Sequence, residues 1–443
     1  MTDYDEVEYP ARVFAQCHPD RLAVVGRLYG LKSAPVENAR VLEMGCGDGL
    51  NLIASAIVLP GARFHGIDLS TTAIQRGRRM VRELGLKNVR LEARDVRSLV
   101  GGGGRYHYVI AHGVYSWVPP DVRDALLAAI RNALTANGIA FVSYSVYPGA
   151  YLRQMVREMA VIFGGRRVEG VREWLNEAAG LQSGPAVYRA VLADEAADML
   201  RRDDGALFHD DLSEVHQPCY FRDFVGHAGN NGLRYVAEAL PDAVTGDDRV
   251  ADGQYADFQT GRRFRQSLLC RSGADVSREP DCSALKHCFV GGPIGRIGAG
   301  SAAHRNAAGE RMLLRLLATA WPAYVPVDGF ERGVSRLFMA GVVDVRTLPP
   351  PVAAARRNPR PKASPLARLQ AENGAGVTSL HHIEVIPGSD SLRAVLILAD
   401  GTRTRAALIR DLRKLYPDNT KEQVASAVDQ HLIELGQYGL LMG

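Results

Sequence analysis

The chain has 443 residues, more than one hydrophobic core usually organises, so two or three domains are expected. Hydrophobic residues make up 47% and charged residues 23%, which excludes a disordered or fibrous chain. A formal net charge of +4 over this length predicts no concentrated basic surface, so nucleic-acid binding is not favoured.

The sequence shows no recognisable pattern for secretion, for a transmembrane helix or for a zinc site. The acidic residues 1–6 lack the apolar region of a secretory signal, and no apolar run reaches the ~18 residues of a transmembrane helix. The six cysteines are scattered, and Cys282, His287 and Cys288 do not have the spacing of a zinc site. We therefore expect a cytoplasmic protein with reduced thiols, no bound metal and no membrane insertion.

The first chemical signal is a strand, a glycine turn and a helix. Residues 40–44 form a short apolar run typical of a buried strand, residues 45–49 read GCGDG, and residues 50–59 are apolar and helix-like. This order opens a doubly wound, Rossmann-like α/β sheet. Glycines let the backbone approach a ligand closely at a helix N-terminus.

The spacing of the glycines distinguishes between ligands. A dinucleotide fingerprint requires a third glycine where Leu50 stands, so a NAD(P) dehydrogenase fits poorly. Glu43, Gly45, Gly47 and Gly49 instead form the pattern E-x-G-x-G-x-G. This pattern resembles the first motif of the class I methyltransferases, which use S-adenosylmethionine (SAM).

The second strand, residues 63–68, ends in a carboxylate about twenty positions after the turn, where an acid can accept both ribose hydroxyls. Asp68 is expected to bind the ribose, with Leu69 beside it. The alternative is that Asp68 caps the following helix, a role for which Ser70 and Thr71 compete.

The third strand, residues 89–93, leads to a second acid. The resemblance to SAM enzymes implies that Asp95 accepts from the adenine amino group and that the backbone of Val96 meets the ring. The alternative is a solvated turn.

The fourth and fifth strands, residues 106–111 and 138–144, complete the predicted sheet. His112, Tyr115 and Trp117 follow the fourth strand, at the sheet edge where ligands bind. The faces of Tyr115 and Trp117 suit a cationic acceptor or the sulfonium, unless one of them only packs beneath the loop. His112 is either a general base or a contact of the cofactor.

Upstream of the first strand, Tyr4, Tyr9 and His18 are candidates for a lid over the cofactor.

Several longer segments resemble one family, the methyltransferases that carry an appended methyltransferase regulatory domain, of which rickettsial outer-membrane-protein lysine methyltransferases are the best known. The matching segments are residues 4–5, 18–23, 112–119, 143–149, 208–212, 220–221, 232–235 and 264–270. The resemblance covers most of the chain up to about residue 271. Two positions depart from the pattern near the expected substrate entrance, Ser145 in place of asparagine and Ala150 in place of tryptophan.

The rest of the chain is expected to form two further domains, so that the divisions are 1–150, 151–275 and 276–443. The middle one reads as helices, with residues 209–211 (HDD) as a cap and turn rather than a metal cluster. The last one weakly resembles a winged helix and is expected to contact protein, including a second copy. Residues 380–385 read as a strand in which the paired histidines are ordinary. The proline-rich residues 349–362 read as a surface linker, or as a phosphate-binding arm through Arg356, Arg357, Arg360 and Lys362.

The sequence thus predicts a SAM-dependent methyltransferase, and the resemblance implies lysine side chains of a protein as acceptors and a possible homodimer. One alternative is a methyltransferase for a small molecule or a peptide natural product. A second is a SAM-binding regulator without turnover.

Overall fold

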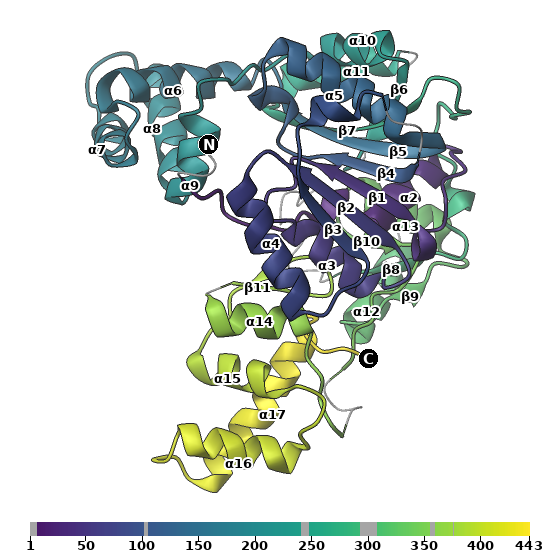
Figure 1. Cartoon of the computed structure of the whole chain (residues 1–443), viewed down its shortest axis with the longest axis vertical. Helices are drawn as coiled ribbons and strands as arrows, with labels where there is room; N and C mark the ends of the chain where they lie inside the picture. The colour runs from purple at the N-terminus through teal and green to yellow at the C-terminus, as the bar shows by residue number, and fades with distance from the viewer. Residues whose placement is uncertain (1–6, 102–104, 241–247, 293–307, 355–358, 375) are drawn as a thin grey trace.

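The computed structural model describes residues 7–101, 105–240, 248–292, 308–354, 359–374 and 376–443 (Figure 1). Tyr4, three of the glycines in the run from 101 to 104, and Arg356 and Arg357 lie outside these residues. At the centre is a seven-stranded sheet in the order β3-β2-β1-β4-β5-β7-β6. Its strands are β1 (Arg40–Met44), β2 (Arg63–Asp68), β3 (Val89–Ala93), β4 (Tyr106–Ala111), β5 (Leu134–Ser145), β6 (Leu233–Glu238) and β7 (Phe264–Arg271).

The first five strands are parallel, and β7 and β6 extend the sheet antiparallel to β5. Both faces are covered, so side chains are buried on either side of a strand. In β4, Tyr108 and Ile110 enter one hydrophobic core, whereas Val109 and Ala111 enter the other. The expected Rossmann-like α/β fold is confirmed.

Helices surround the sheet. The first core includes residues of α2 (Pro19–Leu28), α3 (Leu50–Val58) and α4 (Thr71–Glu83). The opposite core includes α5 (Pro120–Ala133) and α10 (Phe221–Asn230), and α11 (Arg249–Thr260) packs beside α10.

The middle of the chain forms a helical unit that Figure 1 shows beside the sheet. It consists of α6 (Ala150–Gly164), α7 (Val168–Ala179), α8 (Ala186–Leu200), α9 (Asp204–Ala206) and a π-helical turn, η5 (Leu207–Asp211). These helices have a hydrophobic core of their own. The boundaries expected at 150 and 275 stay predictions, and β6 and β7 join the sheet from beyond the first of them.

After β7 the chain first packs against the core that contains residues of α2, α3 and α4. Strands β8 (Phe289–Gly291), β9 (Val325–Pro326) and β10 (Asp344–Arg346) form a small sheet with α12 (Ala308–Ala320) and α13 (Glu331–Met339). This sheet is tied to α2, because Arg21 and Asp344 form an ion pair of 2.6 Å and Asp20 accepts a hydrogen bond of 2.7 Å from the backbone of Thr347.

The remaining C-terminal helices form a separate core at the far end of the molecule (Figure 1). They are α14 (Pro365–Asn373), α15 (Asp390–Leu398), α16 (Arg405–Leu415) and α17 (Lys421–Gln437), with short strands β11 (Val377–Thr378) and β12 (Glu384–Val385). The continuous strand expected over residues 380–385 is wrong. His382 has a left-handed φ of 64°, so the chain turns there between β11 and β12. Among the described residues, no helix combines the length and apolar character that crossing a membrane requires.

Candidate functional site

A cleft of about 390 Å³ lies at the carboxyl ends of β1, β2 and β4, where open α/β sheets bind their ligands. Its walls come from the loops after these strands, from residues 9–12 and Phe14 of the N-terminal segment, and from Asp210 of the helical middle unit. Sequence-predicted residues that line it are Glu43, Gly45, Gly47, Asp68, Leu69, Asp95, Val96, His112 and Trp117. Of the predicted site, Gly49 and Tyr115 are not part of this lining.

The glycine turn brings bare backbone to the cleft. Gly45, Gly47 and Gly49 have φ values of 73°, 57° and 78°, in the left-handed region that favours glycine. A Cβ on Gly47 would have no atom within 4 Å, so this residue faces open space. Gly49 is the N-cap of α3, and a Cβ added to it would lie 2.7 Å from the side chain of Leu91, so this glycine is closely packed.

Asp68 is fixed beside this turn. One carboxylate oxygen accepts from the backbone N–H of Gly47 at 2.8 Å, and the other accepts from that of Ser70 at 2.8 Å. The cap of α4 is Ser70, whose hydroxyl accepts from Ala73 at 3.1 Å. Capping is therefore not the reason for the acid at position 68, and its position in the cleft suits a ribose.

Asp95 occupies the loop after β3 and holds Arg97. Its carboxylate accepts from the backbone and the guanidinium of Arg97, and these hydrogen bonds keep the pKa of Asp95 below its ordinary value. The carboxylate is therefore charged at neutral pH and remains an acceptor for an amino group in the cleft.

Glu43 is a buried carboxyl at the base of the cleft. Its Oε1 accepts from Asn51 Nδ2 at 3.0 Å, whereas its Oε2 is buried without a hydrogen-bond partner. Burial raises the pKa of Glu43 to about 8, with a smaller contribution from Asp48 and Asp68. An unpartnered acidic oxygen at this place fits the cationic methionine end of SAM.

His112 forms a wall of the cleft. Its ring stacks on Phe14 with 3.8 Å between ring centroids, and burial lowers its pKa to about 4. An imidazole that holds a proton this weakly is a poor base for a lysine, whose ordinary pKa is about 10.4. Of the two roles expected for His112, contact with the cofactor fits the structure better.

The two aromatic residues of the loop after β4 face different ways. Trp117 lines the cleft, packs near His216 and keeps a buried indole N–H without a hydrogen-bond partner. Tyr115 is only 3% exposed, and its hydroxyl bonds with His227 at 2.7 Å. The expectation that Tyr115 lines the pocket is therefore corrected, because its ring packs in the core against Phe224.

One of the two departures from the family pattern, Ser145, lies behind this wall. Ser145 is buried, and its hydroxyl bonds at 3.0 Å with Nε2 of His216, the neighbour of Trp117. Ala150 is buried at the start of α6.

The expected lid is only partly present among the described residues. Tyr9 lines the cleft, whereas His18 is buried and caps α2 through its side chain.

Other cleft residues carried no recognisable motif. Asp210 forms an ion pair of 3.0 Å with Arg202, and burial raises its pKa to about 6. The HDD triplet thus lies in a helical turn, η5, as expected, but its two acids form ion pairs instead of a cap. Asp211 instead pairs with Arg153 at 2.9 Å, and the described residues hold no group of three or more histidine, cysteine or acidic side chains placed for a metal ion.

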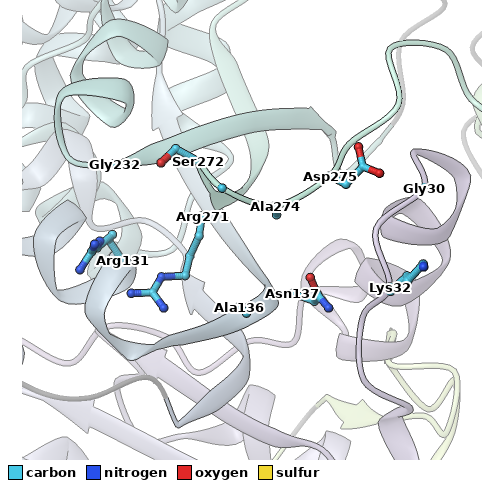
Figure 2. A pocket seen from close by; sticks show the side chains of 11 residues that line it. Gly30, Lys32, Arg131, Ala136, Asn137, Gly232, Arg271, Ser272, Ala274 and Asp275 are labelled. Carbon is cyan, nitrogen blue, oxygen red and sulfur yellow. The ribbon is translucent and has the colours of Figure 1, made fainter.

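A second hollow, of about 540 Å³, opens elsewhere on the molecule (Figure 2). Lys32, Arg131, Asn137, Arg271 and Asp275 lie around it. It lies away from the glycine turn and from the carboxyl ends of β1 and β2, so it does not compete as the cofactor site.

A mainly parallel sheet with a glycine turn, an acid at the end of β2 and another after β3 defines the class of SAM-dependent methyltransferases. Family profiles agree with this assignment. A methyltransferase domain matches residues 41–138, a methyltransferase regulatory domain matches 203–271, and the C-terminal winged helix domain of PKMT matches 359–432. The chain belongs to the SAM-dependent methyltransferases that carry this regulatory domain, and the expected winged-helix character of the C-terminal part is confirmed.

Similar proteins occur in Rickettsia. RP789 of Rickettsia prowazekii is 33% identical over 305 residues, which cover 64% of this chain and 55% of RP789, so the chain spans little more than half of that relative. RP028 of the same organism is 34% identical over 51% of this chain and 93% of its own length. The structure of PKMT2 from Rickettsia typhi matches with a TM-score of 0.84 and 25% identity, covering 98% of this chain and 100% of PKMT2. PKMT2 has the same likeness in its complex with AdoHcy.

Proposed function

We propose that this protein N-methylates lysine side chains of a protein substrate, with SAM as the methyl donor. The observation that carries the proposal is the likeness to PKMT2, a protein lysine methyltransferase by its name, over 98% of the chain. The cleft agrees with a cationic acceptor, because Trp117 offers an aromatic face and Asp210 a carboxylate outside the cofactor motifs.

The chain's own residues position the reactants. Bound SAM supplies an electrophilic methyl group, to which the lysine nitrogen donates its electron pair as the C–S bond breaks. Asp68 and Asp95 hold the ribose and adenine, and Glu43 faces the charged methionine end. Because the methyl group is already activated, the protein contributes mainly orientation and exclusion of water.

The acceptor must reach the methyl group as a neutral amine. Asp210 attracts the lysine ammonium at the cleft, and the apolar surfaces of Trp117, Phe14 and Val118 then disfavour the charged form, which lowers the lysine pKa. The proton leaves to water before transfer. His112 takes no part in this step.

The test is transfer of labelled methyl from SAM into a lysate that is separated into macromolecular and small-molecule fractions. Base-stable label on protein, located on lysine by mass spectrometry, is the expected result. Asp68→Ala should abolish both labelling and SAM binding while leaving the fold intact, and Asp194→Ala, a 78% exposed acid outside the cleft, should change neither. Label only in the small-molecule fraction would replace the protein acceptor by a metabolite. SAM binding without label in either fraction would favour a regulator.

We further propose that the protein works in the cytoplasm and that the C-terminal helices contact a partner protein, including a second copy. Ile386 and Leu415, which are 72% and 59% exposed, leave apolar surface on that unit. Light scattering during size-exclusion chromatography measures the mass, and a monomer at all concentrations would contradict the homodimer.

A further inference from the structure

The C-terminal unit reaches the wall of the cofactor cleft through one buried histidine. His382 lies in the turn between β11 and β12 and is 3% exposed. Its Nε2 lies 2.7 Å from Oδ1 of Asn51, which is 331 positions earlier, in the first turn of α3. Asn51 itself lines the cleft. The sequence pattern predicts a strand here, but the chain turns and places the side chain of His382 against Asn51, a residue of the cleft.

Asn51 joins several parts of the molecule. Its Nδ2 donates to Glu43 Oε1 at 3.0 Å and contacts Cys17 Sγ at 3.4 Å. Its Oδ1 accepts from the backbone N–H of Phe14 at 3.2 Å and from His382. An amide side chain has two donor hydrogens and two acceptor positions, so these partners use its full capacity and fix its orientation.

The protonation of His382 follows from this arrangement. The backbone N–H of Phe14 can only donate, so the amide oxygen of Asn51 faces it and is also the atom nearest to the histidine. Nε2 of His382 therefore carries a hydrogen. Burial, with a contribution from Arg346, lowers the pKa of His382 to about 3, so the ring is neutral.

Two of the other partners of Asn51, Glu43 and Phe14, line the cleft. Glu43 presents its unpartnered Oε2 there, and Phe14 stacks on His112. The contact is also packed, because Leu366 of α14 joins Leu50 and Ile53 of α3 in one hydrophobic cluster. A change in how the C-terminal unit docks is thus transmitted to an acid and an aromatic wall of the site.

We propose that His382 is a positioning residue of the SAM site, which couples docking of the C-terminal unit to binding of SAM through Asn51. This inference rests on the proposed assignment of the cleft to SAM. Coupling of this kind is reciprocal, so SAM should also tighten the docking of the C-terminal unit.

Calorimetric titration with AdoHcy tests the proposal, and the neighbouring histidine provides a matched control. His382→Ala should weaken binding about tenfold, since a buried acceptor loses its donor. His382→Gln, which restores an N–H donor, should recover most of the affinity. His381 belongs to the same unit as His382, but its ring stacks on Trp321, with 4.6 Å between ring centroids, and does not bond Asn51. His381→Ala should therefore leave the affinity within about twofold.

Equal weakening in His381→Ala and His382→Ala, or unchanged affinity in His382→Ala, would overturn the coupling. If wild-type protein does not bind AdoHcy, the assignment of the cleft fails instead. Hydrogen exchange on wild-type protein gives a second measurement that no unfolded variant can compromise. Saturating AdoHcy should slow exchange in α14 and in the turn at residues 379–383, and protection confined to the sheet would contradict the proposal.

Discussion

Glu43 is a buried acid whose hydrogen-bonding capacity is only partly used. One of its oxygens has a buried amide as partner and the other has none. With a pKa of about 8 the carboxyl is mainly protonated at neutral pH, which lowers the cost of burying it. A bound cation would reverse that preference, so this side chain adjusts its charge to the occupancy of the cleft.

The stability of the ligand-free protein should therefore depend on pH through this residue. The folded-state pKa of about 8 is raised above the unfolded value of ~4.3. The stabilising contribution of Glu43 is then fully present below the unfolded pKa and is lost as pH rises through 8. Glu43→Gln keeps the acceptor for Asn51 but does not ionise. Between pH 6 and pH 9, wild-type protein should lose about 1–3 kcal/mol more of its unfolding free energy than the variant in urea denaturation, and parallel curves would contradict this.

Trp117 should matter for turnover more than for SAM binding. Its ring lines the cleft beside His216, whereas the residues proposed to bind the ribose and adenine are Asp68 and Asp95. Trp117→Ala is expected to lower kcat/KM for a protein acceptor ~10- to 100-fold, because cation–π contact and exclusion of water are both lost. The dissociation constant of SAM should change less than about threefold, and Trp117→Phe should keep most of the activity. Equal loss of SAM affinity and turnover would place Trp117 in contact with the cofactor.

At the scale of elements, the sequence predicts what local chain geometry determines. The turn at Gly45 and Gly47 and the acid that ends β2 each depend on a few neighbouring residues, so their pattern reveals both the fold and much of the cleft. The loop after β4 shows where this stops. Tyr115 and Trp117 share one 3₁₀ turn, η4 (Tyr115–Trp117), in which residues two apart point to different sides. Spacing alone cannot tell which of them meets the ligand.

The residues near the cleft that the sequence patterns did not identify come from distant parts of the chain. Asp210 comes from η5 and His382 from the turn before β12, each separated from the glycine turn by more than one complete element. Their neighbours in the chain carry no pattern that refers to the cleft. Strands β6 and β7 were also not expected in the sheet, because an antiparallel edge is added only after the helical middle unit.

Helix α6 carries a buried charge whose removal should destabilise the middle unit. Arg153 is 10% exposed and pairs with Asp211 at 2.9 Å and Glu195 at 3.4 Å, which are themselves 2% and 1% exposed. Arg153→Ala removes the nearest cation of Asp211 and one of the two cations that pair with Glu195, in a low-dielectric core, and should cost about 3 kcal/mol or more. Arg166→Ala removes a pair with Glu214 in which both side chains are over half exposed, and it should cost less than ~1 kcal/mol. Urea denaturation compares the two variants, and similar losses would refute the buried pair as a main support of α6.

At the scale of the whole molecule, the sheet, the helical middle unit and the C-terminal unit meet around one cleft. The sheet provides its floor, the middle unit adds Asp210, and the C-terminal unit supports Asn51 from behind. The cores of the middle and C-terminal units are separate from those of the sheet, so their local stabilities need not be equal.

Binding of AdoHcy should therefore raise the temperature of more than one unfolding transition. At a concentration a hundred times its dissociation constant, a ligand that binds only the folded state adds ~2.7 kcal/mol. Calorimetry should show the transitions of the sheet and of the C-terminal unit both moving to higher temperature. In His382→Ala, the C-terminal transition should move much less. A C-terminal transition that does not respond in wild-type protein would mean that the two units unfold independently.

The antiparallel extension of the sheet also affects how the protein is made. When β5 leaves the ribosome, its outer edge has no partner, because β7 begins only at Phe264, after the whole helical middle unit. An unpaired strand edge is a template for association with other chains. The nascent chain must therefore protect this edge until residue 271 has been synthesised, and an engineered fragment that ends after β5 should aggregate, even though it contains the complete glycine motif.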